Sequence, residues 1–206
     1  MEPADEPTVF LKELHEAEVA VARGLRAVRA GRSRLRDFDS AKAIEWLAQK
    51  KKIELSPTQS VAVGNALKGK VAVITGGPGP GKTTINRAIV EITEALKGRV
   101  VLAAPTGRAA KRLSEACGRE AKTLHRLLEI RPGASARFSA ARLDPDVMVV
   151  DEAGMIDVQM MATIAQSLAS HTHLILVGDV DQLPSVGPGS VLRDLIECGE
   201  IPVSRL

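Results

Sequence analysis

The sequence between Gly76 and Thr83 has the residue types and spacing of a phosphate-binding loop. Gly76 is followed by four residues and then by Gly81, Lys82 and Thr83, directly after an apolar run at 71–75. Glycines allow backbone N–H groups to converge on phosphate oxygens, and the helix expected to follow adds partial positive charge. A chance glycine-rich turn rarely has this context. The pattern therefore predicts that the loop binds a nucleoside triphosphate.

Each polar group of this loop has an expected role. Lys82 would contact the β- and γ-phosphates, Thr83 would ligate Mg²⁺ through its hydroxyl, and Thr84 would support the α-phosphate side. Pro80 removes one N–H from the loop, so neighbouring residues must supply the donors. The predicted nucleotide-binding residues of the loop are Gly77, Gly79, Gly81, Lys82, Thr83 and Thr84.

Two later stretches could complete a catalytic site. Asp151 and Glu152 end an apolar run at 147–150, where Asp151 could hold the hydration shell of Mg²⁺ and Glu152 could orient an attacking water. Gln182 follows the apolar run at 174–177 and could hydrogen-bond the γ-phosphate. The simpler alternatives are an exposed acidic turn for the carboxylates and a polar turn for Gln182.

The elements that must position these residues follow an α/β pattern. Apolar, β-branched runs alternate with segments of helical periodicity, which predicts a mainly parallel sheet flanked by helices. Ligands of such sheets bind beyond the carboxyl ends of the strands, where the polar residues above are expected. The predicted strands are 71–75, 100–104, 147–150 and 174–177, and the predicted helices are about 82–97, 107–117 and 157–170.

The chain before residue 54 has a different pattern. Apolar residues recur every three or four positions from Phe10 to about Arg29, which predicts an amphipathic helix, and a shorter helix around Trp46 follows. We therefore expect a helical appendage at 1–54 and an α/β domain at 55–206. The basic runs in the appendage are more typical of solvated faces than of a DNA footprint.

Composition sets bounds on the classes of function. The 206 residues are 45% hydrophobic with a net charge of +3, which permits an aliphatic core and a polyanionic partner. Three Phe and one Trp leave few platforms for base stacking. Two distant cysteines make a disulfide framework or zinc site improbable, and no apolar run approaches the roughly 18 residues of a membrane span. A cytoplasmic protein without membrane contact is expected.

Five motifs in order resemble those of superfamily 1 helicases, most closely the RecD type, which includes the exodeoxyribonuclease V alpha subunit. The motifs are GGPGPGKTT, APTGRAAKRL, KTLHRLL, VVDEAGMID and LVGDVDQLPSVGPGSVLRDL, and the resemblance covers about residues 53–206. It implies a RecA-like fold and an ATP- and Mg²⁺-dependent motor that moves 5′→3′ on single-stranded DNA in recombination or repair. Gly154 stands where the family often has serine.

The resemblance adds roles for four residues. It implies that Gln59 contacts adenine and that Thr106, Arg108 and His125 contact the DNA backbone. Three of them have a simpler alternative. Gln59 also fits a helix-capping box, Arg108 fits a solvated helix face, and His125, among leucines, fits a core histidine.

The resemblance also implies partners. In the family a second RecA-like domain supplies arginine fingers, which are worth about 10³–10⁵ in rate. We therefore expect this chain to act with such a domain, and possible recombination or nuclease subunits, and to hydrolyse ATP poorly alone. The segment 201–206 is predicted to begin another strand. Alternatives are the motor segment of a conjugative relaxase-helicase of the TraA type, a nucleotide- and DNA-binding module without turnover, and a small-molecule kinase.

Overall fold

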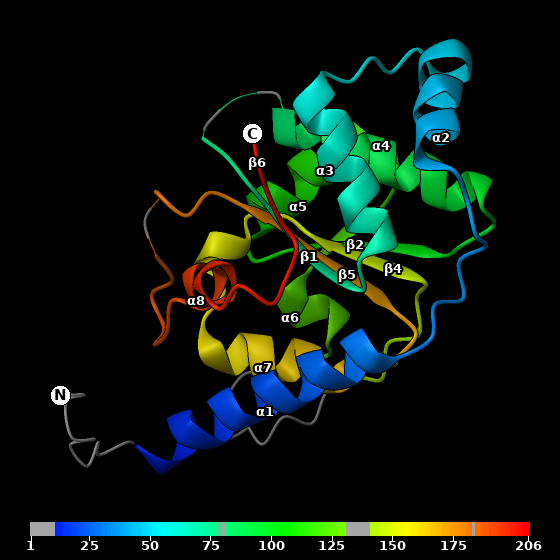
Figure 1. Cartoon of the computed structure of the whole chain (residues 1–206). Coiled ribbons are helices and arrows are strands. Elements are labelled where there is room, and N and C mark those ends of the chain that lie inside the picture. Colours follow the sequence, from blue (N-terminus) through cyan, green and yellow to red (C-terminus); the bar gives the residue numbers. More distant parts are fainter. Residues whose placement is uncertain (1–10, 78, 80, 131–140, 183) are drawn as a thin grey trace, which may run out of the picture.

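The computed structural model describes residues 11–77, 79, 81–130, 141–182 and 184–206, and its framework is one six-stranded sheet (Figure 1). The strand order is β3-β2-β4-β5-β1-β6, and every neighbouring pair is parallel. The strands are β1 (Val71–Thr75), β2 (Val100–Ala104), β3 (Ala121–Thr123), β4 (Val147–Val150), β5 (His173–Gly178) and β6 (Val203–Arg205). The predicted α/β class with a parallel sheet is confirmed.

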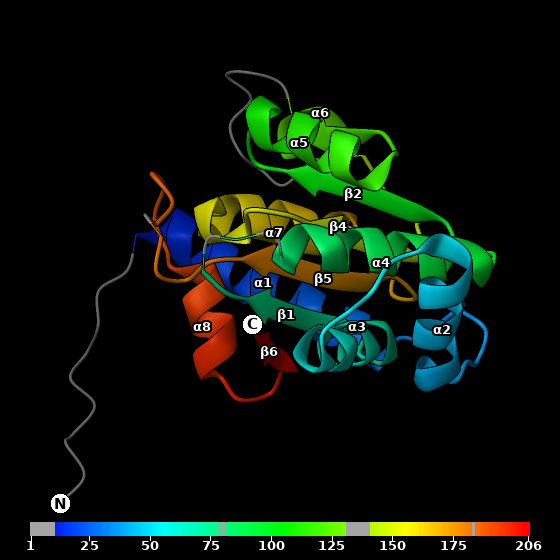
Figure 2. The ribbon, with the colours of Figure 1, turned by 90° about the horizontal axis from the view of Figure 1, so that it is seen from above.

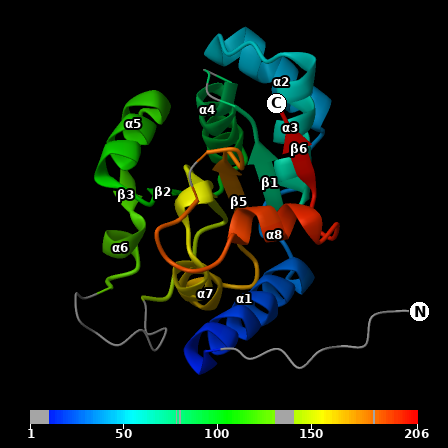
Figure 3. The same cartoon turned by 90° about the vertical axis from the view of Figure 1, so that its left-hand side faces the viewer.

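Helices cover both faces of the sheet, as Figures 1 and 3 show. One face packs on α3 (Pro57–Lys68), α4 (Gly81–Ala95), α5 (Gly107–Cys117) and the π-helical turn η1 (Leu47–Lys51), which continues α2 (Ser40–Trp46). The other face packs on α1 (Lys12–Ala30), α6 (Leu124–Leu127), α7 (Val158–Ser167) and α8 (Val191–Glu197). None of the helices in the described ranges is long and apolar enough to cross a membrane.

The central strands are apolar throughout because both of their faces are buried. Successive side chains of a strand point to opposite faces. In β1, Val71 and Val73 therefore join the core beneath α7, whereas Ala72 and Ile74 join the core beneath α4. This double burial explains why the sequence shows continuous apolar runs rather than alternation.

Most of the predicted elements are confirmed. The bounds of β1, β2, β4 and α5 are those expected, and β6 forms at the predicted place. The edge strand β3 and the short α6 were not predicted. Residues 131–140 lie outside the described residues, as do Phe10 and Pro80.

The segment before residue 54 packs directly on the α/β domain. Helix α1 lies along α7, and its Ala17, Leu25 and Val28 are buried in the core shared with the sheet. A Cβ at Gly24 would lie 2.7 Å from the Cβ of Ala165, so the two helices approach closely only because residue 24 is glycine. The boundary at residue 54 stays a prediction, but the packing holds the preceding helices firmly against the domain.

Candidate active site

Apart from Gln59 on α3, the predicted site residues follow carboxyl ends of strands, and these ends share one edge of the parallel sheet. Lys82 and Thr83 follow β1, Asp151 follows β4, and Gln182 follows β5, which lies between β1 and β4. Figure 3 shows the molecule from the side of this edge, and Figure 2 shows the same order of strands from above. The sheet topology therefore brings three distant sequence segments to neighbouring positions.

The phosphate loop is tied to the sheet and holds its lysine above its own backbone. The N–H of Gly76 donates to the carbonyl of Gly178 at 3.3 Å, and α4 begins at Gly81. Lys82 Nζ donates to the carbonyl oxygens of Gly76 at 2.6 Å and Gly77 at 2.7 Å. These carbonyl contacts are ones that phosphate oxygens could replace. An ammonium group, a helix N-terminus and the exposed Thr83 hydroxyl together fit a triphosphate with its metal ion.

Gln59 connects α3 to this loop. Its Oε1 accepts a hydrogen bond from Ser56 N at 2.8 Å, and its own N–H donates to Ser56 Oγ at 3.2 Å, which completes the capping box. Its Nε2 donates to the carbonyl of Gly81 at 3.4 Å. Capping and a position beside the nucleotide loop are therefore compatible uses of the same side chain.

Asp151 lies half-buried at the end of β4. Burial is the largest influence and raises the pKa of Asp151, and the Glu152 carboxylate adds to this rise. The N–H of Glu152, the side chain of Asn86 and the positive charge of Lys82 lower this pKa. The carboxylate thus faces the start of α4, as a residue that shares a metal ion with Thr83 must.

Glu152 has a left-handed backbone, with φ 54° and ψ 40°, before the short turn at Ala153–Met155. This conformation is unfavourable for a residue with a side chain and is concentrated at functional sites. It turns the chain sharply, so Glu152 and Asp151 need not face the same group. Glycine fits at position 154 because a Cβ there would lie 2.8 Å from the carbonyl oxygen of Asp179.

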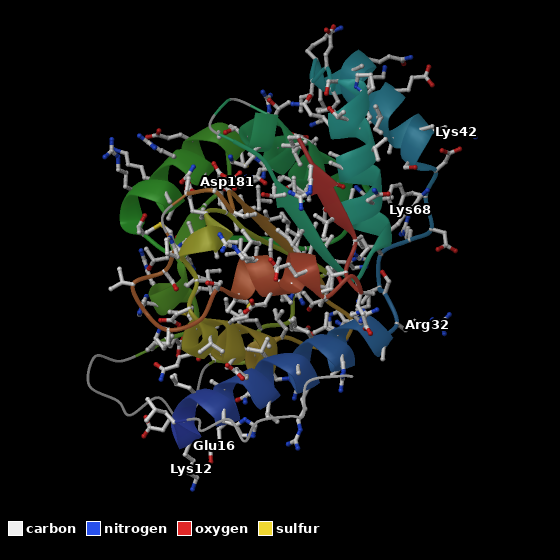
Figure 4. The ribbon with its side chains drawn as sticks, turned by 60° about the vertical axis from the view of Figure 1, so that its left-hand side comes forward. Lys12, Glu16, Arg32, Lys42, Lys68 and Asp181 are labelled. Atoms are coloured by element: carbon white, nitrogen blue, oxygen red, sulfur yellow. The ribbon has the colours of Figure 1, made fainter. Side chains whose placement is uncertain are left out.

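Gln182 is exposed and is held by Asp179. Gln182 Nε2 donates to Asp179 Oδ2 at 3.0 Å, and the N–H of Asp181 donates to Asp179 Oδ1 at 3.0 Å. Asp179 is 5% exposed, so it anchors the loop from within. The sequence analysis did not assign it a role, although its place three residues before Gln182 was a signal. Figure 4 labels Asp181 on this loop.

Three other predicted residues lie at the same edge of the sheet. Thr106 and Arg108 follow β2, and His125 follows β3. Thr106 caps α5, since its Oγ1 accepts a hydrogen bond from the N–H of Ala109 at 3.2 Å. Arg108 and His125 are exposed. His125 is not a core histidine, because the neighbouring Leu124 fills the core instead. Two of the three candidate DNA contacts, Arg108 and His125, therefore lie on the surface, at the same edge of the sheet as the phosphate loop.

The described residues contain no group of three or more His, Cys, Asp or Glu side chains able to hold a metal ion. Mg²⁺ usually keeps several waters and binds through one or two protein oxygens and substrate phosphates. The Thr83 hydroxyl and the Asp151 carboxylate are oxygen donors of the kind that fit this ion.

Comparisons with known proteins give the same type of domain. Residues 59–188 match the family model described as AAA domain. The RecBCD enzyme subunit RecD of Mycolicibacterium smegmatis is 46% identical over 165 residues, covering 68% of this chain and 30% of that protein. The ATP-dependent RecD2 DNA helicase of Deinococcus radiodurans is 35% identical over 196 residues, covering 93% of this chain and 26% of that protein. The chain therefore spans less than a third of the length of these relatives.

A solved structure supports the fold. A chain in the structure titled "Structural Basis for DNA Unwinding at Forked dsDNA by two coordinating Pif1 helicases" matches with a TM-score of 0.52 and 18% identity. The match covers 74% of this chain and 44% of that chain. At this identity it shows the fold alone, a RecA-like arrangement of parallel strands and flanking helices.

Proposed function

Because the chain belongs to the AAA domain family and to the RecD-type superfamily 1 helicases, we propose that it is the first motor domain of a DNA helicase. In this proposal it binds ATP with Mg²⁺ at the carboxyl edge of the sheet and contributes to 5′→3′ movement on single-stranded DNA. The observation that carries the proposal is the convergence of Lys82, Asp151 and Gln182 at the ends of three adjacent strands.

Different residues of the site bind the phosphates, the base and the metal ion of the nucleotide complex. Lys82 and the backbone N–H groups at the start of α4 hold the phosphates, while Gln59 lies where it could contact the base. Thr83 and Asp151 would hold Mg²⁺, which when bound neutralises charge on the phosphate oxygens. No other protein ligand is needed for this, because water and phosphate complete its coordination.

Two residues have proposed roles in hydrolysis. Glu152 orients the attacking water and accepts its proton, and Gln182 hydrogen-bonds the γ-phosphate. Asp179 keeps the Gln182 amide in place, so that its position depends on the end of β5. A change at Gln182 on loss of the γ-phosphate would then be transmitted to the end of β5 through the side chains of Gln182 and Asp179.

The DNA is proposed to cross the same edge near Thr106, Arg108 and His125. A second RecA-like domain would close the groove and supply an arginine to the γ-phosphate, a contribution of about 10³–10⁵ in rate. We therefore propose that this chain alone binds nucleotide, hydrolyses it slowly and does not unwind DNA. Because one relative is a subunit of the RecBCD enzyme, nuclease or recombination subunits in the cytoplasm are proposed partners.

The proposal is tested by measuring nucleotide binding and turnover with this chain. Calorimetry should show binding of ATP and ADP in the presence of Mg²⁺, and ATPase assays should show slow turnover with or without a single-stranded oligonucleotide. Folded protein that binds no nucleotide would contradict the whole proposal. Fast, DNA-stimulated turnover would contradict the need for an arginine from another domain.

A further inference from the structure

A buried amide lies next to the proposed metal site without a hydrogen-bond partner. The side chain of Asn86, on the second turn of α4, is 0% exposed. Neither its Nδ2 nor its Oδ1 makes a hydrogen bond of ordinary geometry with the described residues. Buried polar side-chain atoms nearly always have a partner, and leaving one unpaired is destabilising. The position of Asn86 therefore needs a reason other than stability.

The carboxylate of Asp151 is a group with which the Asn86 side chain interacts. The Asn86 side chain is close enough to this carboxylate to act as a hydrogen-bond donor to it, although the two groups do not meet at full hydrogen-bond geometry. Asn86 also lies three residues after Thr83, so the two side chains are neighbours on the helix surface. Thr83 is exposed above the buried Asn86. Asn86 is thus placed beneath both proposed ligands of Mg²⁺.

We propose that Asn86 is a positioning residue for Asp151, an inference that rests on the proposed binding of Mg²⁺ and nucleotide. Its Nδ2 donates to one carboxylate oxygen of Asp151, and the other oxygen is then directed toward the hydration shell of the metal ion. With the ion bound, this hydrogen bond would hold the Asp151 carboxylate in the orientation that the hydration shell requires.

The energetic scale of such a contact is known from metal sites in general. Outer groups that orient a ligand typically contribute 10- to 100-fold to metal affinity or activity. An apolar residue at position 86 would remove the unpaired amide and would suit the surrounding core of α4. The presence of a polar side chain in this apolar environment therefore favours a role at the site.

The same helix provides a matched control. Thr93 is also 0% exposed, and its Oγ1 also lacks a partner in the described structure. It lies two turns further along α4, beside Gly98 and away from the strand ends. Asn86→Leu and Thr93→Val therefore both replace an unpaired buried polar group by an apolar one, but only the first acts next to Asp151.

The test measures the affinity of each variant for a non-hydrolysable ATP analogue by calorimetry, with Mg²⁺ and with a chelator. In the wild-type chain Mg²⁺ should strengthen binding. In Asn86→Leu this strengthening should fall about tenfold while the metal-free affinity stays the same, and in Thr93→Val both should equal the wild type. Thermal unfolding without ligand checks the fold, and Asn86→Ala serves as the variant with no added volume.

The results separate the inference from the proposed function. If the wild-type chain binds the analogue with no benefit from Mg²⁺, the proposed metal site itself is wrong. If the wild type depends on Mg²⁺ and both Asn86 variants keep the same dependence, Asn86 does not position Asp151. If both Asn86 variants unfold while Thr93→Val stays folded, Asn86 has a structural role and the inference is overturned.

Discussion

The two edges of the sheet use polar residues in different ways. At the amino edge the ring of His173 has both nitrogens engaged: Nδ1 donates to the carbonyl of Gly69 at 2.7 Å, and Nε2 accepts from Ser33 Oγ at 2.7 Å. Lys70 Nζ donates to the carbonyl of His171. At the carboxyl edge, by contrast, Asn86 has no partner among the described residues.

The amino edge also holds the segment between α1 and α2. Arg34 and Arg99 both contact the carboxylate of Asp144, and the N–H of Arg99 donates to Asp146 Oδ2 at 2.7 Å. In Figure 4, Arg32 marks this segment and Asp181 marks the loop at the other edge. These polar groups of the amino edge are paired within the fold, whereas Asn86 at the carboxyl edge has hydrogen-bonding capacity left for a ligand site. Four predictions follow this contrast.

The largest effect is expected from Lys82→Ala at the carboxyl edge. Loss of the ammonium removes a charge-assisted contact to phosphate worth about 2–3 kcal/mol, so nucleotide affinity should fall on the order of 100-fold. The melting temperature of the free chain should change little, because the hydrogen bonds of Lys82 to described residues go to the loop carbonyls of Gly76 and Gly77. Calorimetry measures the nucleotide affinity, and thermal unfolding measures the melting temperature. Unchanged affinity in a folded variant would place the phosphates elsewhere.

Gly31→Ala should lower the stability of the fold and leave nucleotide affinity unchanged, the reverse of Lys82→Ala. A Cβ at this position would overlap the backbone carbonyl of Ser170, so the segment after α1 must shift. We expect the free energy of unfolding to fall by about 1–3 kcal/mol, with nucleotide affinity unchanged. Gly107→Ala is the control for stability, since nothing lies within 4 Å of its Cβ. Equal stability of the two variants in urea would show that the close contact at Gly31 is unimportant.

The pH dependence of stability should report on His173. Burial is the main cause that lowers the pKa of His173 below its ordinary 6.5; Lys70 and His171 lower it further, and Gly69 and Asp146 oppose this. The unfolded chain therefore takes up a proton near pH 6.5 that the folded chain does not. Stability from this group is present above pH 6.5 and is lost as the pH falls below it.

His173→Gln should flatten this part of the curve. Urea unfolding of both proteins between pH 7.5 and 5 measures the slopes, and nucleotide affinity at neutral pH should be equal. If the slopes of wild type and variant coincide, another group is responsible for the loss at low pH.

The smallest effect is expected for Gln59→Glu, which separates two uses of one side chain. Glutamate keeps an oxygen for the N–H of Ser56 but loses the donor to the carbonyl of Gly81. Stability should hold, while the preference for ATP over GTP should fall about fivefold, equivalent to about 1 kcal/mol. Competition binding with the two nucleotides measures this preference. A loss of stability without a change in preference would leave Gln59 with the capping role alone.

Much of the fold was predictable because its strands are buried on both faces. Continuous apolar runs such as 147–150 end in sharp polar boundaries, so the bounds of β4 followed from the sequence. The edge strand β3 could not be predicted in this way. It has three residues, Ala121, Lys122 and Thr123, all half-buried and mostly polar, and only pairing with β2 makes it a strand.

For the candidate site, residue types and spacing were enough to identify the phosphate loop, the acidic pair after β4 and Gln182, because their chemistry depends on local sequence. Asn86 and Asp179 became apparent only in the folded chain. Their importance comes from burial and from neighbours that are distant in sequence, and neither property is encoded in a local pattern. Local backbone geometry is determined by adjacent residues. The partner of a buried polar group is instead determined by which elements the tertiary structure places side by side.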